Sequence, residues 1–423
     1  MYKDTKNIKI INIILLTIIL LSGIAIRLYG AHTIPLTHDE KTRVEAAREL
    51  SKEGKGILVF GHKETQNPPL LLYFIKISYY LFGESVFSTR IPSILLGSLT
   101  LIILFFMVSK FIDTKTALLV TFLSSFSQIF VGFSRLANED GIILFFATCI
   151  IFLIEETKLR KNGLLLLCAG FFFGAGLLVK FTLITLLPAI FIYLAYQNKK
   201  SKFLNIHNYV FFILIIISII SPYLYWNIKN NFYDFNIKVE NIDFFSFSMV
   251  PTALFLGEIF IYLLAGKTDA YILEITSMEY PFVNWVLGLI CISGIFYSIK
   301  NRKNSFIFFL LIIFSTNYIL YSFFRPRTGG GHYFHLDNFW WALILIIPGF
   351  TLGAAMLVDL SKKYKAAKYL VFIIIFYIII NISAFIKIKA NCFIPRESMR
   401  TNEFLKYKDG VSSNPFLCGT SKL

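Results

Sequence analysis

Two neighbouring carboxylates stand at the start of a short amphipathic segment. Residues 37–54 read THDEKTRVEAARELSKEG, in which Thr37 and Glu40 have the spacing of a capping box and Gly54 suits a helix stop. The pattern predicts a helix whose first turn carries Asp39 and Glu40. Such a pair can supply a general base and a ligand for a metal ion or a hydroxyl group. The alternative is that both acids only favour the helix dipole.

Further charged side chains stand at the ends of apolar runs. Glu139 and Asp140 lie in SRLANED, and the pattern leaves open which of the two points inward. Lys180 interrupts a long apolar stretch, where a bare charge is costly, so we expect a phosphate or a carboxylate as its partner. The alternative for Lys180 is a solvated hairpin tip. Arg90 and Arg135 are either phosphate ligands or anchors whose charged ends reach water at the membrane interface.

The segment 325–338, RPRTGGGHYFHLDN, gathers polar side chains in front of an apolar run. Its three consecutive glycines could let backbone amides approach a phosphate, and His332 is a candidate phosphate ligand. The candidate metal ligands of the chain are Glu40, Glu139, His332, His335 and Asp337. Spacing alone does not separate these roles from a solvated connecting loop. A divalent metal ion therefore stays an open expectation, and no cofactor is certain.

The elements that position these side chains must lie in a membrane. The chain has 423 residues, of which 56% are hydrophobic and only 16% are charged, and it contains 46 Phe. A soluble globule has no place for so much apolar surface. The composition therefore excludes intrinsic disorder, a disulfide scaffold and an ordinary cytosolic enzyme. It predicts an all-α polytopic membrane protein.

About eleven apolar runs are candidate transmembrane helices. They are 11–26, 91–109, 116–134, 141–154, 162–179, 181–198, 209–228, 280–299, 305–324, 338–358 and 369–386. The first run lacks a clear cleavage site, so we interpret it as an uncleaved anchor. Two further stretches, 70–82 with Lys76 and 249–266 with Glu258, are interpreted as interfacial or partly inserted. If both spanned the membrane, the count would rise to thirteen.

The positive charge sets the orientation. The chain carries a formal charge of +16, which at first suggests nucleic acid as a partner. With the N-terminus in the cytoplasm, six short connections on that side carry 18 Lys and Arg against five acids. This follows the positive-inside rule, so the charge reports topology and excludes nucleic-acid binding. The outer segments are then 28–89, 229–279 and the tail 387–423, and we expect one membrane domain over 1–423.

Cysteine usage adds one structural expectation. Cys149, Cys168 and Cys291 fall within apolar runs and are expected to be small core residues. Cys392 and Cys418 both fall in the outer tail. They either pair in an oxidising compartment or stay as two free thiols.

A second short helix is predicted in the first outer segment. Asn67-Pro68-Pro69 suits a helix start, LLLYFIKISYYLF follows, and Gly83 suits its end. Its 13 residues are too few to cross a bilayer, so it should lie in the interface. Two interfacial helices between the first two spans are unusual for a transporter.

These residues together resemble a known family. The DE pair, NPPLLLYFIKISYYLFGES with STRIPS, SRLANED and GLLVK follow one another as in the GT-C membrane glycosyltransferases. Within that superfamily the chain is most similar to glycosyltransferase family 39, the protein O-mannosyltransferase and aminoarabinose-transferase group. The resemblance is strong over about 25–200. It departs from the family pattern where Asn67 precedes Pro68 and where Phe181 follows Lys180.

The resemblance implies an activity. Such enzymes move a sugar from a polyprenyl-phosphate carrier to a hydroxyl group on the extracytoplasmic side, with inversion at the anomeric carbon. It implies Asp39 as the base with Glu40 beside it, Asp140 as a further catalytic acid and Lys180 as a donor-phosphate ligand. We extend the phosphate site to Arg90, Arg135 and His332, and we expect the plasma membrane as the location. The acceptor is then a glycolipid, a glycan or a protein.

Two alternatives stay open. A transporter or flippase of lipid-linked or polar solutes would place ionisable groups near the bilayer midplane, often on broken helices in inverted repeats. Here the acids gather near one membrane face and no repeat is visible. A non-catalytic family member that acts only in binding or assembly is the second alternative.

Overall fold

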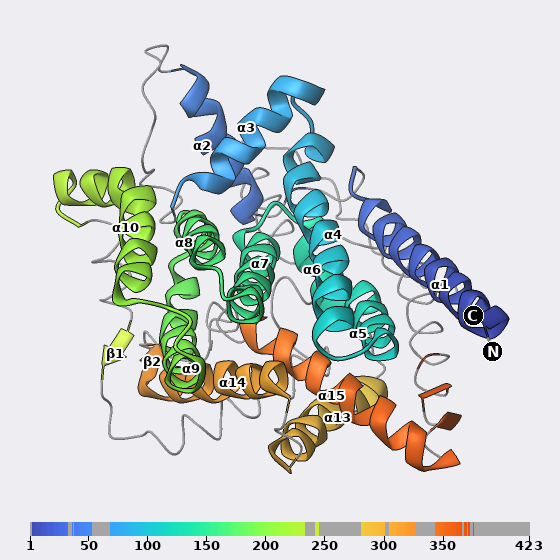
Figure 1. Cartoon of the computed structure of the whole chain (residues 1–423). Coiled ribbons are helices and arrows are strands. Elements are labelled where there is room, and N and C mark those ends of the chain that lie inside the picture. The colour runs from blue at the N-terminus through green and yellow to red at the C-terminus, as the bar shows by residue number, and fades with distance from the viewer. Residues whose placement is uncertain are drawn as a thin grey trace, which may run out of the picture.

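The computed structural model describes residues 2–32, 36, 38–52, 68–232, 242–244, 281–300, 304–326, 343–365, 368, 369, 371, 372 and 375 (Figure 1). Almost all of this part of the chain is helical, which confirms the predicted all-α polytopic fold. The helices are α1 (Tyr2–Leu28), α2 (His38–Lys52), α3 (Leu70–Phe82), α4 (Val86–Phe111), α5 (Thr114–Phe126), α6 (Gln128–Arg135), α7 (Glu139–Arg160), α8 (Gly163–Leu177), the 3₁₀ turn η1 (Phe181–Thr185), α9 (Leu186–Ser201), α10 (Ile206–Lys229), α13 (Pro281–Lys300), α14 (Ser305–Phe323) and α15 (Leu343–Lys363). Two short strands, β1 (Ile242–Phe244) and β2 (Phe324–Pro326), pair antiparallel.

The apolar runs predicted from the sequence coincide with these helices. Each run between 11 and 358 overlaps one helix or two consecutive helices. Five helices within the described residues are long and apolar enough to cross a bilayer, by length and composition: 10–28, 86–111, 181–201, 206–229 and 344–363. The number of eleven spans stays a prediction, and the run 369–386 lies mostly outside the described residues.

Two short helices follow α1, as predicted for the first outer segment. Figure 1 shows α2 and α3 together at one end of the helical bundle, close to the ends of α7 and α8. In α2 the side chains of Val44 and Ala47 are buried, as expected for the apolar face of the predicted amphipathic helix. Helix α3 ends at Gly83, whose φ of 74° is a conformation that suits glycine. Its N-cap is Pro69, while Asn67 lies outside the described residues, as do Thr37 and Gly54.

The run 116–134 was predicted as one helix, and that prediction is wrong. The helix stops after Phe126, and the chain passes through extended backbone at Ser127 before α6 begins. The buried guanidinium of Arg27 on α1 donates hydrogen bonds to the carbonyls of Ser124 and Ser125, at 3.3 and 3.1 Å. The last carbonyls of a helix need donors from outside it. Arg27 supplies these donors, so the break in the helix costs less free energy than it would with unbonded carbonyls.

The core lies between the long helices and is packed closely. One cluster of buried apolar side chains connects α4, α5, α7, α8, α9, α14 and α15. At the crossing of α13 and α15, a Cβ on Gly294 would lie 2.4 Å from the backbone nitrogen of Gly353. Only glycine permits this approach of two backbones. The backbones of α13 and α15 are therefore in direct contact at this crossing.

A second set of ion pairs lies at the far ends of α4 and α7. Lys110, at the end of α4, pairs with Glu156, and Arg160 pairs with the same carboxylate at 2.7 Å. Glu155 is buried and accepts hydrogen bonds from Ser305 and Tyr193. The charged members of this set, Lys110, Glu155, Glu156 and Arg160, belong to the connections that the charge pattern places in the cytoplasm. The opposite ends of α4 and α7 carry the predicted site.

The predictions for the cysteines are confirmed only in part. Cys149 and Cys291 are buried, whereas Cys168 on α8 is exposed, so its prediction as a core residue is wrong. An exposed thiol on an apolar helix suits contact with lipid rather than with the core. Cys392 and Cys418 lie outside the described residues, together with the stretch 249–266, the tail 387–423 and most of 229–279.

Candidate active site

Glu40 and Arg90 form a buried ion pair between α2 and α4. Arg90 donates from Nε and Nη2 to the two carboxylate oxygens of Glu40, both at 2.8 Å, and from Nη1 to the carbonyl of Ala31 at 3.0 Å. The backbone N–H of Ala137 donates to the same carboxylate at 2.9 Å. Both side chains are only 1% exposed. Arg90 is therefore not an interface anchor, and Glu40 is a fully bonded carboxylate.

Arg43 and Glu139 form a second buried pair, between α2 and α7. Arg43 donates from Nε and Nη2 to the two oxygens of Glu139 at 2.8 and 2.5 Å. Both residues lie outside the apolar run 141–154. Burial opposes ionisation of Glu139, but the arginine outweighs it and lowers the pKa of this carboxyl below its ordinary value. This pair answers which way Glu139 points: it faces α2.

Asp140 pairs with Lys180. The ammonium of Lys180 lies 2.7 Å from Asp140 Oδ1, and the two side chains are 14% and 2% exposed. Asp140 stands before the apolar run, and burial raises the pKa of its carboxyl to about 6, although Lys180 opposes that rise. Lys180 breaks the helical hairpin as predicted, because its extended backbone separates α8 from η1. Its expected carboxylate partner is confirmed as Asp140.

Asp39 differs from the other three carboxylates. Its side chain is 51% exposed, and its ion-pair partner, Arg43 Nη1, lies 4.0 Å away. That Nη1 is buried and has no hydrogen-bond partner among the residues that the structure describes. Within that part of the chain, an exposed carboxylate thus stands beside a buried N–H that lacks an acceptor. The helix beneath it is held by both of the buried arginine pairs.

Arg135 has a structural contact at the edge of this group. Its Nη2 donates to the carbonyl of Tyr29, just past the end of α1, at 2.5 Å. Arg135 is 8% exposed, and its Nε is buried and has no hydrogen-bond partner within the described part of the chain. The next turn is tight as well, since a Cβ on Gly141 would lie 2.5 Å from the carbonyl oxygen of Phe133. Arg135 therefore helps to hold α1 against the junction of α6 and α7.

Of the predicted metal ligands, only Glu40 and Glu139 lie within the described residues. Glu40 and Glu139 each give both carboxylate oxygens to an arginine, so metal binding would require breaking a buried pair. His332, His335 and Asp337 lie outside the described residues. In the part of the chain that the structure describes, no three His, Cys, Asp or Glu side chains gather as a metal site would require.

One site residue was not predicted from the sequence. Arg43 links Asp39 and Glu139, and it is not among the site residues predicted from the sequence. The spacing of four residues between Asp39 and Arg43 places both on one face, which was the available signal. The partner in α7 is 96 residues away and gave no such signal.

The chain is similar in sequence to known proteins over part of its length. Residues 66–226 match the profile of the family described as dolichyl-phosphate-mannose-protein mannosyltransferase. An uncharacterized protein of Aquifex aeolicus (strain VF5) is 26% identical over 177 residues, which are 41% of this chain and 35% of that protein.

Solved structures share the fold at low sequence identity. ArnT from Cupriavidus metallidurans, bound to undecaprenyl phosphate, has a TM-score of 0.57 and 13% identity over 82% of this chain and 60% of its own. The archaeal oligosaccharyltransferase AglB from Archaeoglobus fulgidus, in complex with an inhibitory peptide and a dolichol-phosphate, has a TM-score of 0.60 and 12% identity over 95% of this chain and 58% of its own. The chain thus spans about three fifths of the length of these structures.

The resemblance seen in the sequence is thereby confirmed. The chain shares the fold of ArnT and AglB, and its residues 66–226 match the profile described as dolichyl-phosphate-mannose-protein mannosyltransferase.

Proposed function

We propose that the chain transfers a sugar from a polyprenyl-phosphate carrier to a hydroxyl acceptor, with inversion at the anomeric carbon. The observation that carries the proposal is the contrast among four carboxylates. Glu40, Glu139 and Asp140 are buried and paired with cations, whereas Asp39 is half exposed beside a buried arginine N–H. A carboxylate that must take a proton from a substrate has to be accessible and held in place. Asp39 meets both requirements.

The buried pairs hold Asp39 in position. Helix α2 is bound to α4 through Glu40 and Arg90, and to α7 through Arg43 and Glu139. Both pairs lie within one turn of Asp39 along α2. A fixed base avoids the entropic cost of being ordered when the acceptor binds. We therefore assign Glu40, Glu139 and Arg90 a positioning role. For Glu40 this replaces the predicted direct role as a catalytic acid beside Asp39 that binds a metal ion or a hydroxyl group.

The reaction uses one proton transfer and one displacement. Asp39 takes the proton of the acceptor hydroxyl, and that oxygen forms a bond to the anomeric carbon. The bond between this carbon and the phosphate oxygen breaks on the opposite face, and the polyprenyl phosphate leaves with the electron pair. The leaving phosphate gains negative charge and needs cationic donors. Lys180 is the group that we assign to it.

The site belongs to the extracytoplasmic face of the plasma membrane in this proposal. The support is the charge pattern, in which 18 of 41 Lys and Arg lie on six short connections. The Lys110–Glu156 pair lies at the far ends of α4 and α7, away from Arg90 and Glu139. A polyprenyl-phosphate carrier keeps its tail in the bilayer and its sugar at the interface, which is where α2 and α3 would lie.

The test is transfer from a panel of radiolabelled polyprenyl-phosphate sugars in membranes that contain the protein. We expect Asp39→Asn to lower the transfer rate by at least about a hundredfold, the usual contribution of a general base. The matched control is Glu45→Gln, which neutralises an exposed acid on the same helix and should keep the wild-type rate.

The possible outcomes separate the function classes. Transfer by the wild type that Asp39→Asn removes supports the enzyme and the base together. Normal transfer by Asp39→Asn would contradict the assignment of Asp39. A folded wild type that transfers no sugar from any verified donor would point instead to a transporter or to an assembly subunit.

A further inference from the structure

Four exposed lysines lie where the chain turns from α7 into α8 and from α9 into α10. They form the lysine cluster: Lys161, Lys199, Lys200 and Lys202. The acids nearest to them in the sequence, Glu155 and Glu156, are buried and paired with other cations. Among the described residues, no carboxylate forms an ion pair with any of the four lysines. The cluster therefore presents positive charge to its surroundings.

Packing brings the two connections side by side. A Cβ on Gly163, two residues after Lys161, would lie 2.2 Å from the side-chain nitrogen of Asn208 on α10. The side-chain carbonyl of Asn208 accepts from the N–H of Asn205 at 2.9 Å, three residues after Lys202. The starts of α8 and α10 are therefore in contact, and the four lysines belong to one end of the bundle.

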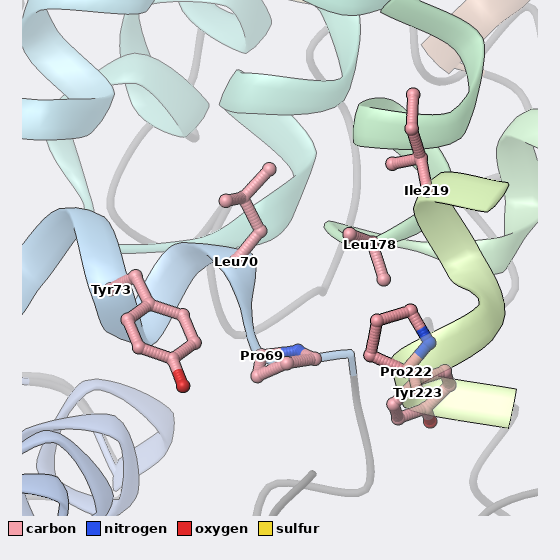
Figure 2. Close-up of a pocket in the computed structure, with 7 residues that line it drawn as sticks. All are labelled: Pro69, Leu70, Tyr73, Leu178, Ile219, Pro222 and Tyr223. Carbon is pink, nitrogen blue, oxygen red and sulfur yellow. The ribbon is translucent and has the colours of Figure 1, made fainter. Parts of the chain in front are cut away.

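The other ends of α8 and α10 belong to the candidate active site. Lys180 follows α8 at that end, where Leu178 and Ile219 line the same apolar cavity (Figure 2). Because α8 has 15 residues and a helix rises about 1.5 Å per residue, its two ends are about 22 Å apart. The lysine cluster is therefore separate from the site described above.

An aromatic ring holds one lysine of the cluster in place. The ammonium of Lys200 lies 4.2 Å from the ring centroid of Tyr196 and donates to its hydroxyl at 2.7 Å. The Tyr196 ring packs in turn against Phe308 of α14, at 4.9 Å between centroids. An exposed lysine loses side-chain freedom when it binds a ligand, and this cost is smaller for a side chain that is already ordered.

An apolar surface begins next to the lysines. Leu164 on α8 is exposed, and so are Ile206 and Val210 in the first turns of α10. Helix α10 is long and apolar enough to cross a bilayer, so these side chains face acyl chains when it does. Cations at the rim of a surface with hydrocarbon beside them match the two parts of an anionic phospholipid.

We propose that the lysine cluster binds the headgroup of an anionic phospholipid, whose acyl chains lie along the exposed faces of α8 and α10. The partner belongs to the leaflet that contacts this end of the helices. One lysine near a membrane surface favours anionic lipid by about 1 kcal/mol, or about fivefold. The inference does not depend on the proposed transfer reaction, because it concerns the opposite end of the helices.

The lysines at the end of α15 differ from the cluster and supply the control. These α15 lysines are Lys362, Lys363 and Lys365, all of them exposed. Lys362 lies 3.9 Å from Asp113 and Lys363 lies 3.5 Å from Asp359, so acids partly neutralise this group. Asp113 precedes α5 at the end of the bundle opposite the candidate active site, as the cluster does. Both groups can therefore carry the same topological signal, but only the cluster has its charge free of acids among the described residues.

The test measures lipid association with the purified full chain in phosphatidylcholine vesicles. Electron paramagnetic resonance of spin-labelled phosphatidylglycerol and phosphatidylcholine gives the share of each lipid that is immobilised by the protein. The cluster variant is Lys199→Gln/Lys200→Gln/Lys202→Gln. The control variant replaces the three α15 lysines by Gln and removes the same charge. Lys161→Gln, a single change in the other connection, is the second test variant.

We expect the wild type to favour phosphatidylglycerol over phosphatidylcholine by about fivefold. The cluster variant should favour it by less than about twofold, and Lys161→Gln should lower the preference in the same direction. The control variant should keep most of the preference. In 1 M NaCl the wild type should lose most of it, because the Debye length falls to about 3 Å. Thermal unfolding shows whether each variant is folded, and Lys161→Gln decides if the cluster variant is not.

Three results would overturn the inference. A preference that survives in the cluster variant and in Lys161→Gln would show that these lysines bind no lipid. Equal loss in the control variant would mean that the positive charge acts on the membrane as a whole. Displacement of spin-labelled phosphatidylglycerol by glycerol 3-phosphate would show that a phosphate without acyl chains is sufficient, which contradicts the role of the apolar faces.

Discussion

The candidate site places four carboxylates and three of its cations close together, and burial decides what each can do. A buried carboxylate needs a counter-ion, because the cost of removing it from water is large. Arg90, Arg43 and Lys180 meet that need for Glu40, Glu139 and Asp140. Asp39 reaches solvent and is not bound in this way. Asp39 is therefore the carboxylate among these four that can reach a substrate hydroxyl group.

A residue-scale prediction separates the two roles of Arg43. Arg43→Met alone removes the arginine that bonds both oxygens of buried Glu139, which should lower the free energy of unfolding by about 3–5 kcal/mol. Arg43→Met combined with Glu139→Leu removes both charges and should be close to neutral for stability. We nevertheless expect the double variant to lose at least about tenfold in transfer rate, because the N–H beside Asp39 is gone.

The measurements are thermal unfolding in detergent and sugar transfer. A double variant that is both stable and fully active would show that Arg43 serves only the fold.

At the scale of the elements, the site depends on how three helix ends are held together. α2 has little apolar surface, yet ion pairs to α4 and α7 fix it at the end of the bundle. The break between α5 and α6 lets Arg135 reach the end of α1. Arg27 stabilises that break by donating to the last carbonyls of α5.

The element-scale prediction concerns this break. Arg27→Leu removes the donors of buried carbonyls and should lower the free energy of unfolding by about 1–3 kcal/mol. The control is Arg48→Leu, which removes an exposed ion pair with Glu84 and should change stability by less than about 1 kcal/mol.

Chemical denaturation followed by tryptophan fluorescence compares the two variants. Equal or higher stability of Arg27→Leu would mean that burying the guanidinium costs more than its hydrogen bonds return.

At the scale of the whole molecule, charge and chemistry lie at opposite ends of the same helices. The first turn of α7 carries Glu139 and Asp140, and its last turns carry Glu155, Glu156 and basic residues. The N-terminal part of α4 carries Arg90, and its last turn carries Lys110. A bilayer between these two ends would separate the site from the basic connections.

Thiol labelling tests this orientation. In a variant with the five native cysteines replaced, Glu45→Cys should react with a membrane-impermeant maleimide added to intact cells. Ser201→Cys, at the last residue of α9, should react only after the membrane is opened. The reverse pattern would place the site in the cytoplasm and contradict the extracytoplasmic assignment.

The sequence by itself determined the features that depend on local patterns, which are the helices, their ends and their breaks. The apolar runs predicted the helices, and Gly83 predicted the end of α3. The single charge of Lys180 predicted both the break in its hairpin and an oppositely charged partner. These features depend on neighbouring residues and on the transfer of side chains into a bilayer, so they need no knowledge of the fold.

Only the tertiary structure decided which charges meet. Glu40 and Arg90 are 50 residues apart, Arg43 and Glu139 are 96 apart, and Arg27 is 98 residues from the carbonyl of Ser125 that it caps. No local periodicity encodes contacts between residues so far apart in the sequence. The exposure of Asp39 beside three buried acids is set by the packing of α2 against α4 and α7, because burial is a property of the assembled helices and not of the residue types.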